Sequence, residues 1–224
     1  MNWRAVGPNW VLLSGYPVAI IHFLGGAFVG AAPQLSYGKL LETLAAEGYV
    51  IIATPFLNTL DHRAIAHTVL QQFETTVAEL QQRQLLQRHL PIYGLGHSLG
   101  CKLHLLIGSF FDVDRAGNML MAFNNFNVDR AIPLADWLDQ SWSVEFTPTP
   151  AQTYQLIQDY YPIDQNLLIR FQNDELDQTP EIAQLLDHLF PGKIRLKRLP
   201  GNHLTPLGQD FRWQSPETFS PLDA

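Results

Sequence analysis

The stretch GLGHSLGCK, residues 94–102, decides how the rest of the chain is interpreted, because it contains a G-x-S-x-G pattern around Ser98. The apolar run 91–95 predicts a buried strand before the pattern, and apolar residues at helical spacing predict a helix after it. A serine at such a sharp turn has a strained backbone, so its neighbours must be small, as Gly96 and Gly100 are. The pattern predicts a nucleophilic Ser98. It leaves open a glycine turn in which Ser98 only caps the helix.

The segments on both sides continue this alternation of strands and helices. Short apolar runs predict further strands at 18–23, 49–53, 118–123, 167–171 and 194–199, and amphipathic spacing predicts helices at 35–47, 63–88 and 180–190. Apolar strands separated by helices indicate an α/β fold whose mostly parallel sheet has helices on both faces. Residues 127–164, rich in Trp, Pro and Tyr, are longer than an ordinary connection. We expect them to form a small lid inserted into a single domain, 1–224.

The composition limits which binding partners and which cellular location we expect. Hydrophobic residues make up 46% of the 224, which suits one sizeable core, and the net charge of −7 with no dense basic run argues against nucleic-acid binding. Cys101 is the single cysteine, so an internal disulfide is excluded. We expect a soluble, cytoplasmic protein without a secretory signal or transmembrane segment. The composition leaves the oligomeric state open.

Two stretches resemble a known superfamily. Residues 96–100, GHSLG, look like the nucleophile elbow of α/β-hydrolase serine hydrolases, many of which carry a histidine before the serine. Residues 22–30, HFLGGAFVG, resemble the oxyanion loop of lipases and esterases, with Leu24 in place of the histidine and Ala27 in place of the third glycine of His-Gly-Gly-Gly. HFLGGAFVGAAPQLSY and GHSLGCKLHLLIGS together resemble a branch of this superfamily from cyanobacteria and plastids. The resemblance implies the α/β-hydrolase fold and no particular substrate.

A serine hydroxyl needs a base to take its proton and a carboxylate to orient that base. In this superfamily the chain order is serine, acid, histidine. His203 lies in the loop directly after the last predicted strand, where the superfamily has its base, whereas His188 falls within a predicted helix. We therefore expect His203 to be the base, the alternative being an ordinary surface histidine.

The acid is expected after the penultimate predicted strand. Asp174 lies just past residues 167–171 and matches the superfamily position best. Asp177 is the alternative acid, and Asp129, after the previous strand, is a third possibility. The aspartates after residue 171 could instead be turn residues, which Asp commonly is.

The resemblance also implies oxyanion donors and a pocket. The N–H of Leu99, directly after the nucleophile, and those of Gly26 and Ala27 are the expected donors. Asn124 and Asn125, at the carboxyl edge of the sheet, could position a substrate or simply form a turn. In the expected lid, Trp137 and Trp142 could line an acyl or aromatic pocket, or pack the insertion onto the body.

These residues together predict a chemistry. We expect a serine hydrolase that cleaves a carboxylic ester or thioester of a small-molecule or lipid-like acyl substrate through Ser98, His203, Asp174 and an acyl-enzyme. The histidines lack a third ligand for a metal site, so we expect no metal and no cofactor. Two alternatives stay open: an acyltransferase with the same triad, and a non-catalytic hydrolase-like binding or scaffold protein, which the imperfect oxyanion loop favours.

Overall fold

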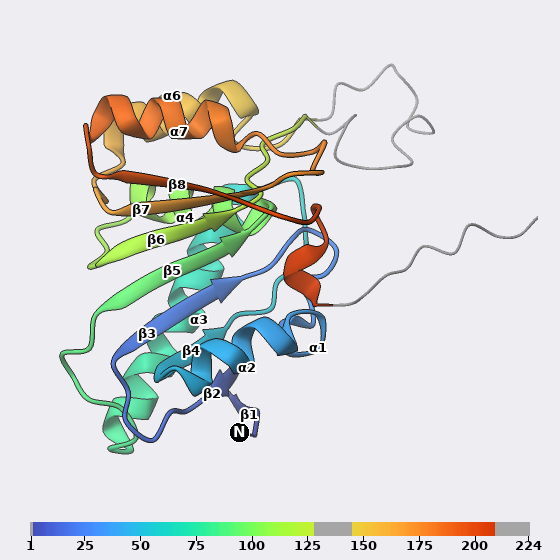
Figure 1. The fold of residues 1–224 in the computed structure, drawn as a ribbon. Helices are drawn as coiled ribbons and strands as arrows, with labels where there is room; N and C mark the ends of the chain where they lie inside the picture. The colour runs from blue at the N-terminus through green and yellow to red at the C-terminus, as the bar shows by residue number, and fades with distance from the viewer. Residues whose placement is uncertain (1, 128–144, 209–224) are drawn as a thin grey trace, which may run out of the picture.

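A sheet in the order β1-β2-β4-β3-β5-β6-β7-β8 forms the centre of the protein (Figure 1). The computed structural model describes residues 2–127 and 145–208. From β4 to β8 along this order all neighbouring strands are parallel, while β2 pairs antiparallel with both β1 and β4. The strands are β1 Arg4–Val6, β2 Asn9–Leu12, β3 Ala19–Leu24, β4 Tyr49–Ala53, β5 Ile92–His97, β6 Gly117–Met121, β7 Asn166–Phe171 and β8 Ile194–Leu199.

The apolar runs predicted β3 to β8 within one or two residues at either end. The hairpin of β1 and β2 was not predicted, because its strands have only three and four residues. Gly7, with φ 55°, forms its turn. Such short segments carry too few residues for an alternating pattern to stand out.

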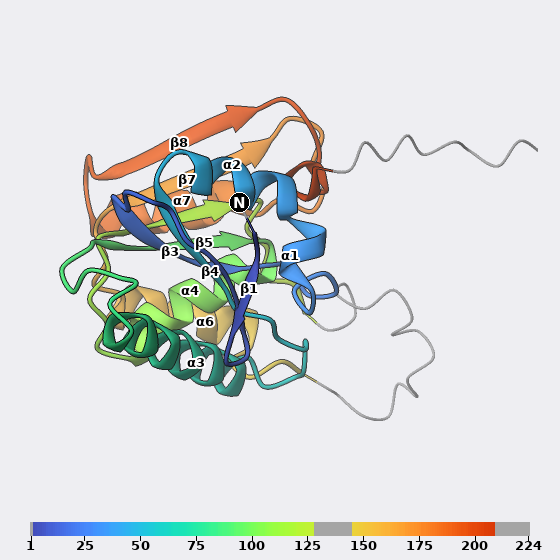
Figure 2. The same ribbon diagram turned by 90° about the horizontal axis from the view of Figure 1, so that it is seen from below.

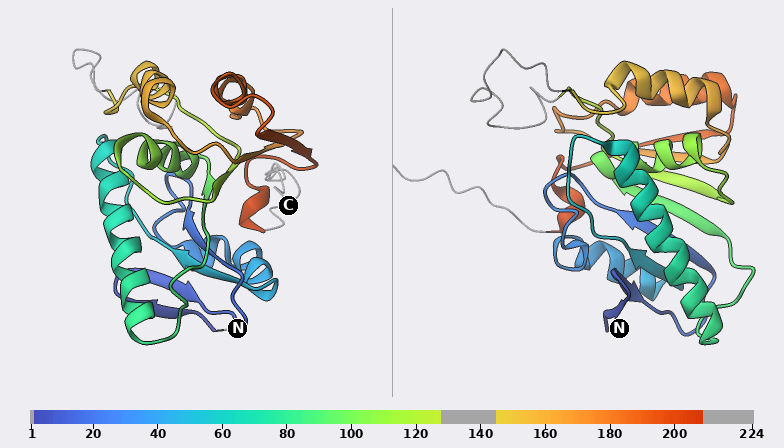
Figure 3. Two further views of the ribbon diagram at one scale, coloured as in Figure 1. Left: turned by 90° about the vertical axis from the view of Figure 1, so that its left-hand side faces the viewer. Right: turned by 180° about the vertical axis from the view of Figure 1, so that it is seen from behind.

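Helices cover the sheet on both sides, as Figures 2 and 3 show. Residues of α2 pack with β3, β4 and β5 in one apolar cluster, and residues of α3, α4, α6 and α7 belong to the clusters of the opposite face. This arrangement confirms the predicted α/β class. The helices are α1 Pro33–Ser36, α2 Gly38–Ala46, α3 His62–Gln82, α4 Leu99–Phe110, α6 Pro150–Tyr160, α7 Thr179–Leu189 and the 3₁₀ turn η2 Thr205–Leu207.

Two predicted helices differ from the observed ones. The helix predicted at 35–47 is divided into α1 and α2 at Tyr37, whose φ of −120° is not helical. The helix predicted at 63–88 ends at Gln82, because the chain turns at Gln84 with φ 58°. In both places a local backbone turn overrides a continuous amphipathic pattern.

The expected lid at 127–164 is described only in its second half. There Thr149 and Gln152 form a capping box for α6, and Ile157 is buried in the cluster shared with α4 and α7. Residues 128–144, with Trp137, Trp142 and Asp129, lie outside the described residues. The lid therefore stays a prediction. None of the helices in the described ranges is long and apolar enough to cross a bilayer.

A cluster of buried polar side chains surrounds His22, a residue of β3. His22 accepts a hydrogen bond from Arg115 at Nδ1, 3.1 Å away, so its Nε2 donates to Thr54 Oγ1 at 3.2 Å. The ring of His104 meets the ring of His22 edge-on at 5.1 Å. Burial, with the charge of Arg115, lowers the pKa of both histidines, and lowers that of His104 to about 3. Both rings are therefore neutral in the folded protein at neutral pH.

This cluster predicts that stability falls in mild acid. Below pH ~6.5 the unfolded chain binds a proton at residue 104 while the folded chain does not until about pH 3, so unfolding becomes easier. In denaturant titrations between pH 6.5 and 4, His104→Gln should lose about 1.4 kcal/mol less unfolding free energy per pH unit than the wild type. His188→Gln, at an exposed position, is the control and should keep the wild-type slope. Equal slopes for wild type and His104→Gln would contradict the assignment.

Candidate active site

Ser98 occupies a strained turn between β5 and α4. Its backbone has φ 56° and ψ −118°, and its N–H donates to the carbonyl of Met121 at 2.9 Å. A positive φ at a residue other than glycine costs free energy and persists only where the surroundings hold it. The side chain of Ser98 makes no capping hydrogen bond to α4. Ser98 therefore occupies the N-cap position of α4, but its hydroxyl does not cap the helix.

The two glycines of the pattern allow close backbone approaches. A Cβ at Gly100 would overlap the carbonyl oxygen of Leu24 at the end of β3 and lie 2.8 Å from that of Gly25. A Cβ at Gly96 would lie 2.6 Å from the backbone nitrogen of Cys101. Neither position has room for a side chain. The start of α4 can thus pack directly against the loop that follows β3.

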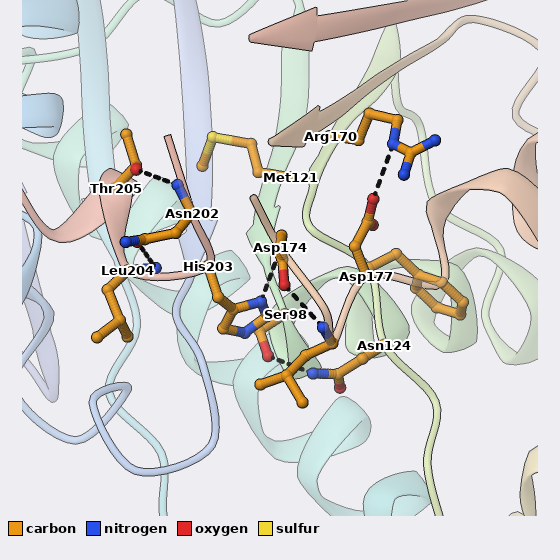
Figure 4. Close-up of polar contacts among 12 residues, drawn as sticks. Ser98, Met121, Asn124, Arg170, Asp174, Asp177, Asn202, His203, Leu204 and Thr205 are labelled. Carbon is orange, nitrogen blue, oxygen red and sulfur yellow. Dashed lines mark hydrogen bonds and ion pairs between the residues drawn. The ribbon is translucent and has the colours of Figure 1, made fainter. Parts of the chain in front are cut away.

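Asn124 holds the hydroxyl of Ser98. Its Nδ2 donates to Ser98 Oγ at 2.8 Å, and Figure 4 shows this bond at the end of β6. Ala122, which precedes it by two residues, has φ 51°, a second strained position at the carboxyl edge of the sheet. Asn125 points elsewhere: its Nδ2 donates to the carbonyl of Pro150, and its backbone N–H donates to Gln178. The structure thus brings Asn124 to the serine and uses Asn125 to anchor the loop.

His203 and Asp174 form a hydrogen-bonded pair. The Nδ1 of His203 donates to Asp174 Oδ2 at 2.8 Å, and the other carboxylate oxygen accepts the N–H of Leu176. The side chain of Asp174 is fully buried, and that of His203 is 16% exposed. Burial alone would raise the pKa of Asp174, but the bond and charge of His203, with the Leu176 N–H, outweigh it and hold this pKa below its usual value. The carboxylate is therefore ionised at neutral pH.

Asp177, the alternative acid, has other partners. It accepts the N–H of Thr179 at 2.9 Å, and its second oxygen lies 3.3 Å from Nε of Arg170 (Figure 4). The separation from Arg170 is that of an ion pair without hydrogen-bond geometry. Burial raises the pKa of Asp177. Asp177 thus stabilises the start of α7, and Asp174 is the aspartate that meets His203.

Backbone bonds hold the loops of the pair together. The N–H of Gln172 donates to the carbonyl of Leu199, and that of Asn173 to the carbonyl of Gly201. Figure 4 shows Ser98, Asn124, Asp174 and His203 gathered at this edge of the sheet. Among the described residues Ser98 Oγ has Asn124 as its hydrogen-bond partner and makes no hydrogen bond to the His203 ring.

A chain of hydrogen bonds connects the backbone of His203 to the other loops at this edge of the sheet. The Nε2 of His97 lies 2.9 Å from the carbonyl oxygen of His203, which can only accept, so Nε2 carries the proton. The Nδ1 of His97 therefore accepts from the hydroxyl of Tyr37 at 2.8 Å, and that hydroxyl accepts the N–H of Gly26 at 2.8 Å. Burial and the neighbouring His203 lower the pKa of His97 to about 3, which agrees with a neutral ring.

Of the three N–H groups expected as oxyanion donors, one takes part in this series of hydrogen bonds and two do not. The N–H of Gly26 donates to Tyr37 and is not free for an oxyanion. The N–H groups of Ala27 and Leu99 have no acceptor among the described residues, and both residues line one small pocket together with Asn124. The pair that the geometry leaves available is Ala27 and Leu99.

Sequence reasoning missed Tyr37 and the roles of His97 and Asn124. Tyr37 follows residues 22–30 without any sequence pattern that separates it from an aromatic residue of the core. His97 adjoins the serine in sequence, and its ring bonds to Tyr37 and to the carbonyl of His203. In the described part of the chain, no group of three or more His, Cys, Asp or Glu side chains could hold a metal ion.

Comparisons with known proteins identify the fold. The FphF serine hydrolase of Staphylococcus aureus, described as fluorophosphonate-binding, has TM-score 0.62 and 14% identity, with 93% of this chain and 97% of that chain covered. A soluble variant of monoglyceride lipase from Saccharomyces cerevisiae has TM-score 0.62 and 13% identity, covering 91% and 87%. The thioesterase domain of the curacin biosynthetic pathway has TM-score 0.59 and 14% identity, covering 92% and 94%. These similarities show the α/β-hydrolase fold.

Sequence comparison gives the family. A family model described as "Protein of unknown function (DUF1350)" matches residues 2–224. No curated protein matches the chain.

Removing the hydroxyl of Tyr37 should destabilise the protein. Tyr37→Phe leaves the N–H of Gly26 and the Nδ1 of His97 buried without partners, so the unfolding free energy should fall by about 1–3 kcal/mol. Urea titration at pH 7 measures this change. Tyr16→Phe is the matched control and should be neutral, because Tyr16 is 92% exposed. A Tyr37→Phe protein as stable as the wild type would show that these bonds do not hold the loops.

Proposed function

The chain belongs to the DUF1350 family, and we propose that it is a serine hydrolase that cleaves a carboxylic ester or thioester through an acyl-enzyme on Ser98. The observation that carries this proposal is the strained Ser98 turn at the same sheet edge as the hydrogen-bonded pair of His203 and Asp174. The α/β-hydrolase fold supports it, and thioesterase and monoglyceride lipase, named among the similar structures, fit an acyl substrate of this class.

The hydrogen bonds suggest how the serine is activated. Because Ser98 Oγ accepts from Asn124, its own proton is free to pass to Nε2 of His203. Asp174 holds Nδ1–H, fixes the tautomer and stabilises the imidazolium that forms. Ser98 Oγ then bonds to the carbonyl carbon, and the alcohol or thiol leaves with the proton from His203. Water attacks the ester of Ser98 in the same way and releases the acid.

The oxyanion of each tetrahedral intermediate needs donors that are already in place. The free N–H groups of Ala27 and Leu99 meet this requirement, and the start of α4 adds the positive end of its dipole. The Tyr37 bond to Gly26 holds the loop that presents Ala27. Here Gly26 is a positioning residue.

One observation favours a second candidate, a hydrolase-like binding protein without turnover. The hydroxyl of Ser98 is bonded to Asn124 and not to His203. In a hydrolase this bond must coexist with a Ser98–His203 contact when substrate binds. An acyltransferase with the same triad differs only in the acceptor, and product analysis with added alcohols distinguishes it.

A fluorophosphonate probe tests the nucleophile. Wild-type protein should be labelled covalently, because the probe reacts with activated serines, and Ser98→Ala should lose the label. Ser109→Ala, a change farther along α4 where the hydroxyl bonds only to Leu105 O, should keep it. Mass spectrometry measures the adduct. Folded wild-type protein that takes up no probe and cleaves no short or long acyl ester would favour the binding protein.

Paired aspartate variants test the acid. Asp174→Asn should lower kcat on an ester by about 10³–10⁴-fold, because the amide favours the wrong tautomer of His203. Asp177→Asn weakens the start of α7 but should retain kcat per folded molecule. Circular dichroism before each assay gives the folded fraction. An Asp177→Asn loss as large as that of Asp174→Asn would reverse the assignment.

A further inference from the structure

A small pocket beside the proposed oxyanion donors has a buried cation in its wall. Ala27, Leu99 and Asn124 line one part of it, and Lys102, His62 and Phe146 line another. The proposed chemistry of Ser98 uses neither Lys102 nor His62. Both are polar side chains in a place where an unmatched polar group costs free energy.

Lys102 lies one helical turn after the nucleophile. Residues four apart share a helix face, and Lys102 lines the same pocket as Leu99, the residue after Ser98. The residue is 1% exposed, and its ammonium donates to the carbonyl of Pro148 at 3.2 Å and lies 5.8 Å from the centre of the Phe146 ring. An ammonium group has three protons to donate, so this single bond leaves two without a partner in the described structure.

No described carboxylate balances the charge of Lys102. Its ammonium makes no ion pair with an Asp or Glu among residues 2–127 and 145–208. Burial lowers the pKa of Lys102 to about 7, and no neighbouring group opposes this shift. A buried ammonium without a counter-ion is costly, and an anion bound beside it removes that cost.

His62 is the second unused group. It is 2% exposed, its ring stacks on that of Phe146 at 4.3 Å, and neither nitrogen has a hydrogen-bond partner in the described structure. Burial and the charge of Lys102 lower its pKa to about 3, so the ring is neutral and has one N–H to offer. A hydrocarbon chain in this pocket would leave the protons of the Lys102 ammonium and the N–H of His62 unsatisfied, whereas an anion can accept from both.

We propose that this pocket is a subsite for a carboxylate of the substrate, which the ammonium of Lys102 and an N–H of His62 hold beside the reacting carbonyl. The inference rests on the proposed function and names its substrate class. Because the pocket adjoins Ala27 and Leu99, the carboxylate is only a few bonds from the ester. It belongs either to the acyl part, as in a monoester of a short dicarboxylic acid, or to the alcohol part. The single positive charge matches a carboxylate.

Two pairs of esters test the proposal and separate these sources. Monoethyl succinate is compared with ethyl succinamate, its uncharged isostere, and 4-acetoxybenzoate with 4-acetoxybenzamide. In one pair the charged ester should have a kcat/KM at least tenfold higher, and the pair that shows it identifies the acyl or the alcohol part. An enzyme that hydrolyses the neutral esters and prefers neither charged one would overturn the subsite.

Variants assign the preference to its residues. Lys102→Met keeps the length and packing of the stem, and should lower kcat/KM for the preferred charged ester at least tenfold more than for its amide. His62→Phe keeps the stack on Phe146 and should reduce the preference severalfold. Lys197→Met, at an exposed position on β8, is the control and should keep both rates. A Lys102→Met enzyme with the wild-type preference would overturn the proposal.

Binding to Ser98→Ala separates this proposal from the proposed function. Calorimetry should show at least tenfold tighter binding of the preferred charged ester than of its amide, and Lys102→Met in the same background should remove the difference. If the wild type is neither labelled by the fluorophosphonate nor active on any ester, but this difference is present, the hydrolase proposal fails and the subsite stands. If labelling and neutral hydrolysis are present without the difference, only the subsite fails.

Discussion

The hydrogen bonds of the Tyr37 hydroxyl are the constraint on which the geometry of the site depends. Through them the loop after β3, the end of β5 and the loop after β8 are held to one another. The loop after β8 is far from the other two segments in sequence, and β8 pairs with neither β3 nor β5. Burial raises the pKa of Tyr37 and lowers that of His97, so both stay neutral over the physiological range. The direction of each bond is therefore fixed across that range, and with it the backbone of His203.

The packing around Ser98 stabilises its strained backbone conformation. The backbone N–H of Ser98 is held by Met121, and its Cβ comes close to the position a side chain on Gly26 would occupy. Gly100 lets the start of α4 touch the end of β3. The positive φ thus costs about 1–3 kcal/mol at a point where three parallel strands over-determine the backbone. The next N–H in the chain, that of Leu99, has no acceptor among the described residues.

The fold and the pair of His203 and Asp174 were predictable because their signals are local. Apolar runs predict β3 to β8, and the positions of Asp174 and His203 in the loops directly after the last two predicted strands single them out as a pair, whereas His188 falls within a predicted helix. Contacts between distant segments leave no such pattern. The bond from Asn124 to Ser98 and the diversion of the Gly26 N–H to Tyr37 depend on side chains that meet only after folding. The sequence predicts that Asn124 lies at the carboxyl edge of the sheet, but it does not predict that its side chain bonds to Ser98.

The burial of Lys102 could not be predicted from the sequence either. In the sequence it is a polar residue between apolar helix positions, and solvent exposure would be the default expectation. The loop that holds Pro148 and Phe146 buries it instead, one turn from Ser98. Of these two charged groups, the carboxylate of Asp174 is paired with His203, whereas the ammonium of Lys102 has only the carbonyl of Pro148 as a hydrogen-bond partner among the described residues. A neutral ester would leave that imbalance in place, while an ester that carries a carboxylate would neutralise it on binding. For the proposed hydrolysis, this imbalance favours an anionic ester over a neutral lipid.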